Sequence, residues 1–347
     1  MSHSQHAEQK RPQLALFEHD GERDFDPTSY DRYVIALSGG KDSVAAILHL
    51  LDLGIDRDKM ELWHHKVDGD EGDGLMDWPV TPAYCEAVAE ALGIDIFMSW
   101  KVGGFEREML RENEKTAAMR FEVPDGDVRE TGGNNGSKST RRMFPQVSGN
   151  LQVRWCSSYL KMDVASAALR NQKRFERGRT LFITGERAEE SPKRRKMDPL
   201  EPHDADLRNG STKTRWIDHW RPMLRWPEED VWEIMEKHRI NPHPAYRLGW
   251  GRCSCQFCIF GSDDQFASAW EVSPERARKI AEYEEEFGTT IKRDRSVREM
   301  AERGESYDMD EGAVEVAMSK DFEEPVILEE EEWEMPQGAF GDMAGPS

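Results

Sequence analysis

Long apolar runs are missing from this chain of 347 residues. No stretch approaches the roughly 18 consecutive apolar residues of a membrane-spanning helix, and the first residues contain no apolar signal-peptide region. Cysteine is scarce too, with five residues in all. So few thiols argue against a disulfide-stapled secreted protein and favour thiols that serve a metal or catalysis in a reducing compartment. The composition therefore predicts a cytoplasmic protein with no membrane partner.

Acidic residues outnumber basic residues, and the two kinds of charge are unevenly distributed along the chain. The net charge is −21, yet residues 305–334 hold 13 acidic residues against one lysine, whereas residues 170–196 hold ten Lys and Arg against four acids. A run of like charge is typical of a solvated, disordered segment. We therefore expect a disordered acidic tail at residues 304–347. The alternative is that this tail folds over the basic segment and competes there with nucleic acid.

The most informative stretch is residues 33–43, Tyr-Val-Ile-Ala-Leu-Ser-Gly-Gly-Lys-Asp-Ser. Its five mostly apolar first residues predict a buried strand. The helix expected next carries an apolar face at the i, i+3, i+4, i+7 spacing. Between them, Gly39 and Gly40 let the backbone approach a ligand and direct free N–H groups at it. A strand, a glycine turn and a helix N-terminus together predict an anion site that suits pyrophosphate.

This turn is not an ordinary nucleotide P-loop. The G-x-x-x-x-G-K-[ST] pattern fails because Ile35 stands where its first glycine belongs and Asp42 follows Lys41. Lys41 supplies a point charge, and the hydroxyls of Ser38 and Ser43 supply further hydrogen bonds to an anion.

The remaining pattern predicts an α/β fold with a doubly wound, mainly parallel sheet. We expect strands at 33–37, 61–67, 94–100 and 180–184, and helices at 81–92, 226–238 and 274–287. Residues 124–150 are expected to form a long mobile loop. The expected organisation is a flexible arm at 1–30, a nucleotide-binding α/β domain at 31–200, a helical region carrying a cysteine cluster at 201–303, and the acidic tail.

Polar residues that follow strands are candidates for ligand contact, because parallel α/β sheets bind ligands at the carboxyl ends of their strands. Asp68 suits a ribose hydroxyl or a metal ion, or is simply a solvated loop acid. Arg187 and Arg194 suit phosphate or sulfate, or belong to a solvated basic face. Of His64 and His65, one has to face inward, and a core histidine is the simpler interpretation.

Four of the five cysteines form the second strong pattern. Cys253, Cys255 and Cys258 lie within six residues, and Cys156 supplies a fourth thiol from far upstream. Four thiolates complete a site for zinc or for an iron–sulfur cluster. The C-x-C-x₂-C spacing with a remote fourth ligand departs from paired zinc knuckles, so we favour [4Fe–4S] over zinc. Cys85 is interpreted as a small core residue.

These motifs resemble the phosphoadenosine phosphosulfate (PAPS) reductase family of the PP-loop ATP pyrophosphatase superfamily, whose fold is adenine nucleotide alpha hydrolase-like. They are most similar to its iron–sulfur branch, which includes the sulfurtransferase component of DNA phosphorothioation systems. The matching motifs, in order, are Ser-Gly-Gly-Lys-Asp-Ser at 38–43, Asp68 with 78–81, 154–161, 185–191, 221–222 with 230–232, 241–246 and 252–258.

The resemblance implies roles for residues of this chain. It implies catalytic residues at Lys41, Asp42, Lys161 and Arg187. It implies nucleotide contacts at Ser38, Gly39, Gly40, Lys41, Asp42, Ser43, Asp68, Arg187, Glu190, Ser191 and Arg194. It implies cluster ligands at Cys156, Cys253, Cys255 and Cys258.

One departure from the family bears on the reaction. Sulfonucleotide reductases of this family use a nucleophilic cysteine in a late Glu-Cys-Gly motif, and no cysteine follows Cys258 here. We therefore expect an enzyme that uses ATP with Mg²⁺, adenylates an acceptor with release of pyrophosphate, and transfers sulfur with its cluster. The alternatives are a PAPS-type sulfonucleotide reductase and a nucleotide-binding regulatory module. DNA, tRNA and a small molecule all stay open as acceptor, and a cysteine desulfurase-type protein is the expected sulfur donor.

Overall fold

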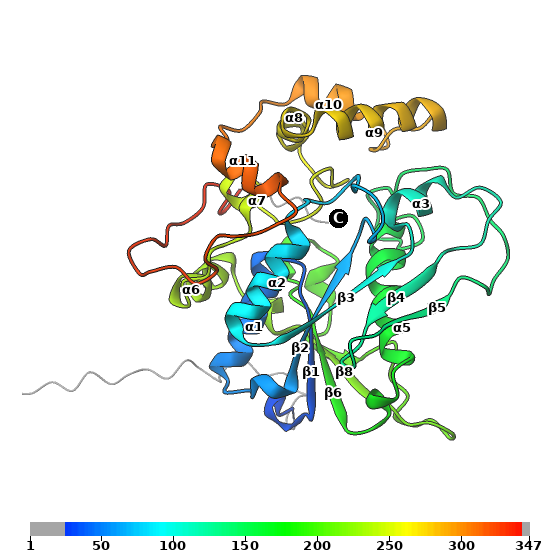
Figure 1. Ribbon diagram of the computed structural model, residues 1–347, viewed down its shortest axis with the longest axis vertical. Helices are drawn as coiled ribbons and strands as arrows, with labels where there is room; N and C mark the ends of the chain where they lie inside the picture. The colour runs from blue at the N-terminus through cyan, green and yellow to red at the C-terminus, as the bar shows by residue number, and fades with distance from the viewer. Residues whose placement is uncertain (1–24, 342–347) are drawn as a thin grey trace, which may run out of the picture.

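The computed structural model describes residues 25–341, which are built around one eight-stranded sheet (Figure 1). The spatial order of the strands is β5-β4-β3-β2-β1-β6-β8-β7. Strands β3, β2, β1, β6 and β8 run parallel, and the strands beyond them at both edges pair antiparallel. The strands are β1 (Arg32–Ala36), β2 (Met60–Lys66), β3 (Asp95–Lys101), β4 (Ala118–Glu122), β5 (Val128–Gly132), β6 (Arg179–Ile183), β7 (Leu200–Pro202) and β8 (Trp216–Trp220).

Helices cover both faces of this sheet, as a doubly wound fold requires. Apolar side chains of α1, α2 and α6 pack on one face, and those of α5 pack on the other. The helices are α1 (Lys41–Asp52), α2 (Thr81–Leu92), α3 (Gly104–Leu110), α4 (Trp155–Ser157), α5 (Asp163–Arg170), α6 (Glu228–Lys237), α7 (Pro244–Arg247), α8 (Asp263–Val272), α9 (Pro274–Phe287), α10 (Val297–Arg303) and α11 (Glu311–Met318). Helices α8, α9 and α10 form a separate group at one end of the sheet (Figure 1).

The predicted α/β fold is confirmed. The four expected strands are β1, β2, β3 and β6, and the expected helices are α2, α6 and α9. The central strand β1 is apolar throughout its middle because both faces are covered: Tyr33, Val34 and Ile35 are at most 1% exposed. After β1, the chain adds β2 and β3 on one side of β1, and it later adds β6 on the other side. The switch point between β1 and β6 is where a doubly wound sheet binds its ligand.

The sheet is larger than the sequence indicated. Strand β5 lies inside residues 124–150, which we expected to form a loop, and it pairs with β4 over Ala118–Glu122. Strand β8 pairs with β6 beyond the expected boundary at residue 200. The expected N-terminal arm lies largely outside the described residues, but Tyr30 is buried and donates to Asp218 at 2.8 Å. No helix within residues 25–341 is long and apolar enough to cross a membrane.

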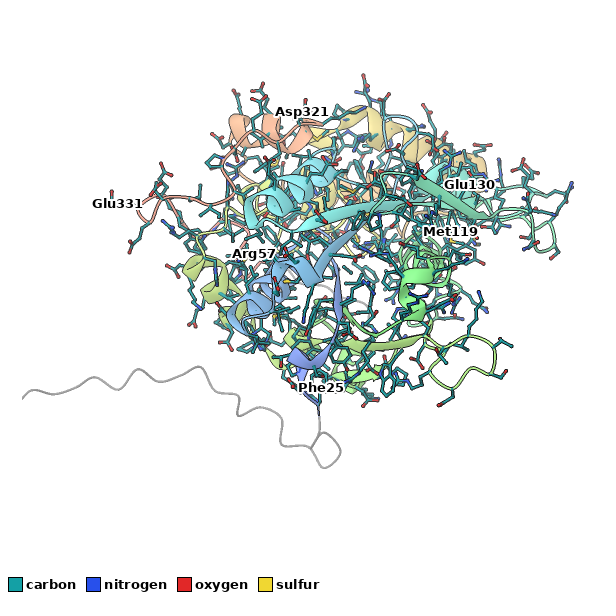
Figure 2. The ribbon with its side chains drawn as sticks, turned by 60° about the horizontal axis from the view of Figure 1, so that its bottom comes forward. Phe25, Arg57, Met119, Glu130, Asp321 and Glu331 are labelled. Carbon is teal, nitrogen blue, oxygen red and sulfur yellow. The ribbon has the colours of Figure 1, made fainter. Side chains whose placement is uncertain are left out.

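The acidic segment that we expected to be disordered is folded within the described residues. It contains α11, Ile327 bridges to Ile240, and the Trp333 indole donates to the Ile240 carbonyl at 3.0 Å. Its carboxylates pair with Arg247 and Arg239, which lie outside the basic segment at 170–196. Figure 2 shows Glu331 of this segment and Glu130 of β5 at opposite sides of the molecule.

Candidate functional site

A cavity of about 580 Å³ lies at the carboxyl ends of the central strands. The loops that follow β1, β6 and β8 line it, together with the ends of β1, β2 and β6 themselves. It therefore occupies the switch point of the sheet, where the sequence predicted the anion-binding turn. The site residues predicted from sequence that line it are Ser38, Gly40, Lys41, Asp42, Ser43, Lys161, Glu190, Arg194 and Cys253.

The turn at 38–43 is held by its own hydroxyls. The Ser43 Oγ donates to the Gly40 carbonyl at 2.7 Å and accepts from the Ser38 amide at 3.2 Å. Gly40 is the N-cap of α1 and has no side chain to cap the helix, and the Lys41 amide, the first of α1, donates to the Tyr246 hydroxyl at 3.0 Å. This arrangement leaves a helix N-terminus and a glycine turn at the cavity wall, which suits a bound anion.

Two glycines permit the close packing of this turn. Gly39 has φ +79°, a left-handed conformation that favours glycine. A Cβ at Gly185, which follows β6, would lie 2.6 Å from the carbonyl carbon and oxygen of Asp42. The loop after β6 therefore touches the anion turn through its backbone, and a side chain at residue 185 would force the two apart.

Lys41, Asp42 and Arg187, which we predicted as catalytic, are brought together as a charge network beneath the turn. Arg187 is fully buried and donates from Nε to Asp42 at 2.5 Å. The Lys41 ammonium is 1% exposed and lies 3.1 Å from the Glu228 carboxylate and 3.4 Å from that of Asp42. Burial opposes the charge on Asp42, but these two cations hold its pKa below the usual value. Arg187 does not line the cavity, so its ion pairs position the turn.

Lys161 lies in a different setting. It sits on a π-helical turn, Ser158–Met162, and lines the cavity. Burial opposes its charge, but the negative charges of Cys255 and Asp77 raise its pKa. Its cavity also contains Arg154 and Arg252. These three cations of the cavity lining are able to hold the anionic end of a nucleotide.

Three other predicted contact residues have local partners. The Asp68 carboxylate accepts from the amides of Met76 and Asp77 at 2.9 and 2.7 Å, which fixes the turn after β2, and the residue does not line the cavity. The Ser191 hydroxyl is buried and accepts from the Arg194 amide. Glu190, which does line the cavity, pairs with Arg194 and accepts from the Arg187 amide at 3.1 Å.

The four patterned cysteines are free thiols in partly buried positions. Burial raises the pKa of Cys156 to about 11, and the charge of Cys258 adds to this shift. Burial likewise raises the pKa of Cys253 and of Cys255, and Cys258 charge also acts on Cys255. Cys85 is fully buried, as predicted for a core residue. Across residues 25–341, no three His, Cys, Asp or Glu side chains lie close enough together to hold a single metal ion.

The ends of β6 and β8 carry further polar groups that were not among the predicted site residues. Thr184 bonds both the His219 imidazole, at 2.6 Å, and the Glu186 carboxylate. Arg221 lies 3.0 Å from the other imidazole nitrogen and pairs with Glu201 at 2.6 Å. All five side chains line the cavity. The signal was available for Thr184 and Glu186, at the end of the strand expected at 180–184, and for Arg221, in the motif 221–222, but His219 and Glu201 carried none.

A family model matches this chain over residues 131–260, and its description is phosphoadenosine phosphosulfate reductase domain. The match covers the Cys156 motif, the loop after β6 and the Cys253–Cys258 segment, and lies downstream of the turn at 38–43.

Curated relatives and solved structures give further similarities. An uncharacterised 37.8 kDa protein of Escherichia phage 186 is 31% identical over 133 residues, 38% of either chain. The adenosine 5′-phosphosulfate reductase of Allochromatium vinosum is 28% identical over 36% of this chain and 49% of its own. The chain thus matches less than half the length of each. A Candida glabrata FMN adenylyltransferase structure with FMN and an ATP analogue overlaps 66% of this chain and 56% of its own, at 13% identity and a TM-score of 0.35.

The fold is shown by the strand order of the chain itself, and the similarity to the reductase family by the domain match and the curated reductases. The cavity lies where that fold binds ligands, and the matched domain supplies one of its walls. The chain is therefore similar to the phosphoadenosine phosphosulfate reductase family, through the domain match over residues 131–260 and the two adenosine 5′-phosphosulfate reductases.

Proposed function

We propose that this protein binds ATP in the cavity, adenylates an acceptor with release of pyrophosphate, and replaces the adenylate with sulfur by means of an iron–sulfur cluster. The observation that carries the proposal is the single cavity that contains both the anion turn, through Ser38 and Ser43, and the cysteine segment, through Cys253. A nucleotide held by the turn would have its reacting phosphate in reach of the thiol-bearing segment.

The residues present are suited to in-line displacement at the α-phosphorus. An acceptor oxygen forms the new P–O bond, the bond to the bridging oxygen breaks, and pyrophosphate leaves with its electron pair. This chemistry needs positioning and neutralised charge more than covalent help. The turn at 38–43 would hold the departing pyrophosphate with Mg²⁺, and Lys161 and Arg194 would bind the negative oxygens.

The donor set supports a cluster rather than zinc. Cys253, Cys255 and Cys258 lie within six residues and Cys156 is remote in the sequence, a spacing that departs from paired zinc knuckles. A [4Fe–4S] cluster binds each cysteine at a separate iron atom, so its ligands stand farther apart than those of one zinc ion. When bound, the cluster would supply redox and sulfur-carrying chemistry beside the nucleotide.

The second candidate is a sulfonucleotide reductase that releases sulfite. Two relatives carry the name adenosine 5′-phosphosulfate reductase, which favours this candidate. Against it, no cysteine follows Cys258 to attack the sulfonucleotide, and four cysteines committed to a cluster leave only the buried Cys85.

A nucleic acid, either DNA or tRNA, is the macromolecular acceptor that the charge pattern favours. Lys193 and Arg194 of the basic segment line the cavity, so a polyanion bound along this segment would reach the reacting phosphate. A sulfur-donor protein such as a cysteine desulfurase would complete the reaction by supplying the sulfur atom.

The deciding experiment is anaerobic turnover of the reconstituted protein with labelled ATP or labelled PAPS, measuring pyrophosphate and sulfite together. Pyrophosphate from ATP, increased by DNA, tRNA or a small acceptor, supports the proposal. Sulfite from PAPS without ATP cleavage supports the reductase. Binding of either nucleotide with neither product leaves a regulatory module. The Lys161→Gln variant is the matched control for product formed outside this cavity.

A further inference from the structure

His64 near the end of β2 combines burial with an unused hydrogen-bonding atom. The side chain is 2% exposed and lines the cavity of the anion turn. Its Nδ1 lies 2.9 Å from the Leu37 carbonyl oxygen, one residue before the turn begins. Its Nε2 is buried and makes no hydrogen bond to any residue between 25 and 341.

The Leu37 contact determines which nitrogen carries the proton. A carbonyl oxygen can only accept, so Nδ1 must be the N–H donor, and a neutral imidazole with its proton on Nδ1 leaves a lone pair on Nε2. Cys85 Sγ, at 3.4 Å from Nδ1, lies on the same side of the ring and leaves Nε2 unaffected. Nε2 is therefore a fixed hydrogen-bond acceptor.

The ring stays neutral at physiological pH. Burial lowers the pKa of His64 to about 4, and the positive charge of Lys161 acts in the same direction. A buried acceptor without a partner costs free energy, so such atoms usually meet a donor in the functional complex. Because His64 lines the cavity, a ligand bound there is the group placed to bring a donor to Nε2.

We propose that His64 Nε2 accepts a hydrogen bond from an N–H or O–H group of the nucleotide bound in the cavity, and so selects ligands that carry this donor. His64 is thereby a specificity residue of the site, in place of the core histidine that the sequence favoured. This inference rests on the proposed nucleotide site. The donors that an adenine nucleotide offers are the exocyclic amino group of the base and the ribose hydroxyls.

Binding measurements with ATP and three analogues test the assignment. Purine riboside triphosphate lacks the amino group, and the 2′-deoxy and 3′-deoxy forms of ATP each lack one hydroxyl. Wild type should bind one of the three roughly fivefold to tenfold more weakly than ATP, the effect of one neutral hydrogen bond. The analogue that loses affinity identifies the donor.

Two substitutions at His64 distinguish the roles of its two ring nitrogens. His64→Asn keeps an N–H group at the position of Nδ1 for the Leu37 carbonyl but removes Nε2, so it should bind ATP and the discriminating analogue equally. His64→Gln places an oxygen near the position of Nε2 and should restore part of the discrimination. The control His238→Gln, at a half-buried histidine that does not line the cavity, should discriminate as wild type does.

A spectroscopic readout does not depend on these variants. In the full chain labelled with ¹⁵N-histidine, ATP should move the Nε2 resonance of His64, and the discriminating analogue should not. The inference would be overturned if His64→Asn still bound ATP more tightly than the discriminating analogue, or if ATP did not shift the Nε2 resonance. Either result would leave the nucleotide site intact. Failure of wild type to bind ATP would overturn the proposed function and this inference together.

Discussion

The hydroxyl of Tyr246 accepts a hydrogen bond from the backbone amide of Lys41, 3.0 Å away, at the first residue of α1. The same oxygen accepts from the amide of Cys253 at 3.1 Å. One buried phenol therefore joins the anion turn to the cysteine segment.

Removing this hydroxyl should uncouple the two segments. In Tyr246→Phe, two buried amides lose their acceptor, and we expect the free energy of unfolding to fall by about 2 kcal/mol together with weaker ATP binding. Tyr84→Phe is the matched control, because Tyr84 is equally buried but donates to the Asn241 carbonyl and does not line the cavity. Urea unfolding and ATP titration check both variants. Equal loss of ATP affinity in the two would refute the coupling.

A methyl group at residue 185 should open the site. In Gly185→Ala the new Cβ would meet the Asp42 backbone at 2.6 Å, so the turn or the loop after β6 has to move. We expect ATP affinity to fall by at least about tenfold, as a displaced ligand cradle loses more than one hydrogen bond. Gly149→Ala, whose Cβ would meet nothing within 4 Å, should bind ATP as wild type does. Unchanged affinity in Gly185→Ala would show that the contact is not needed.

The ion pair between Asp42 and Arg187 should make stability depend on acid pH. Although burial opposes the charged form, Lys41 and Arg187 hold the pKa of Asp42 below its unfolded value of about 3.9. Its stabilisation is therefore present above that value and is lost as pH falls through the lower folded pKa. Asp42→Asn should lose about 3 kcal/mol at neutral pH, and its unfolding curve should approach that of wild type below about pH 4. A constant difference at all pH values would contradict the assignment.

We expect the positive charge of Lys161 to contribute to ATP binding. We expect Lys161→Gln to weaken ATP binding by about tenfold or more, the value of one charge-assisted hydrogen bond, and to reduce the salt dependence of binding. Lys173→Gln removes an equal charge outside this cavity and should change neither quantity. Titrations at two ionic strengths make the comparison. Equal effects of the two variants would mean that Lys161 influences ATP binding only through the net charge of the protein and not through a contact with ATP.

Cluster ligation should depend on the four patterned cysteines and not on the fifth. After anaerobic reconstitution, Cys255→Ser should lose the iron–sulfur charge-transfer absorbance and most of its iron. Cys85→Ser, in the buried face of α2, should keep both. Iron analysis and visible spectroscopy provide the readout. Full iron content in Cys255→Ser would refute the four-cysteine assignment.

Much of the fold was readable from short-range patterns. The apolar run at 33–37 became β1 because a strand covered on both faces needs apolar side chains throughout. The position of the cavity followed in turn, since the strand order fixes the switch point. Strand β5 was missed because an exposed edge strand such as Val128–Gly132 carries polar side chains and no apolar period.

The partners of the charged residues were not readable. Lys41 and Arg187 were expected to meet a ligand, whereas the structure turns both toward carboxylates, among them Glu228 from a segment 187 positions after Lys41. Charge type gives the class of partner but not its identity, which long-range packing decides. The prediction for the acidic segment was wrong for the same reason. Its composition indicated disorder, whereas a few apolar residues such as Ile327 and Trp333 hold it against Ile240.

The docking of the acidic segment fixes where its negative charge lies. Because Trp333 and Ile327 hold this segment against Ile240, its carboxylates occupy a fixed region of the protein surface. The basic residues 193–196 lie in another part of the fold, beside the cavity. The negative charge of this segment is thus fixed in one region of the described fold, so the repulsion felt by an approaching anion depends on its direction of approach. The range of that repulsion shortens as salt is added.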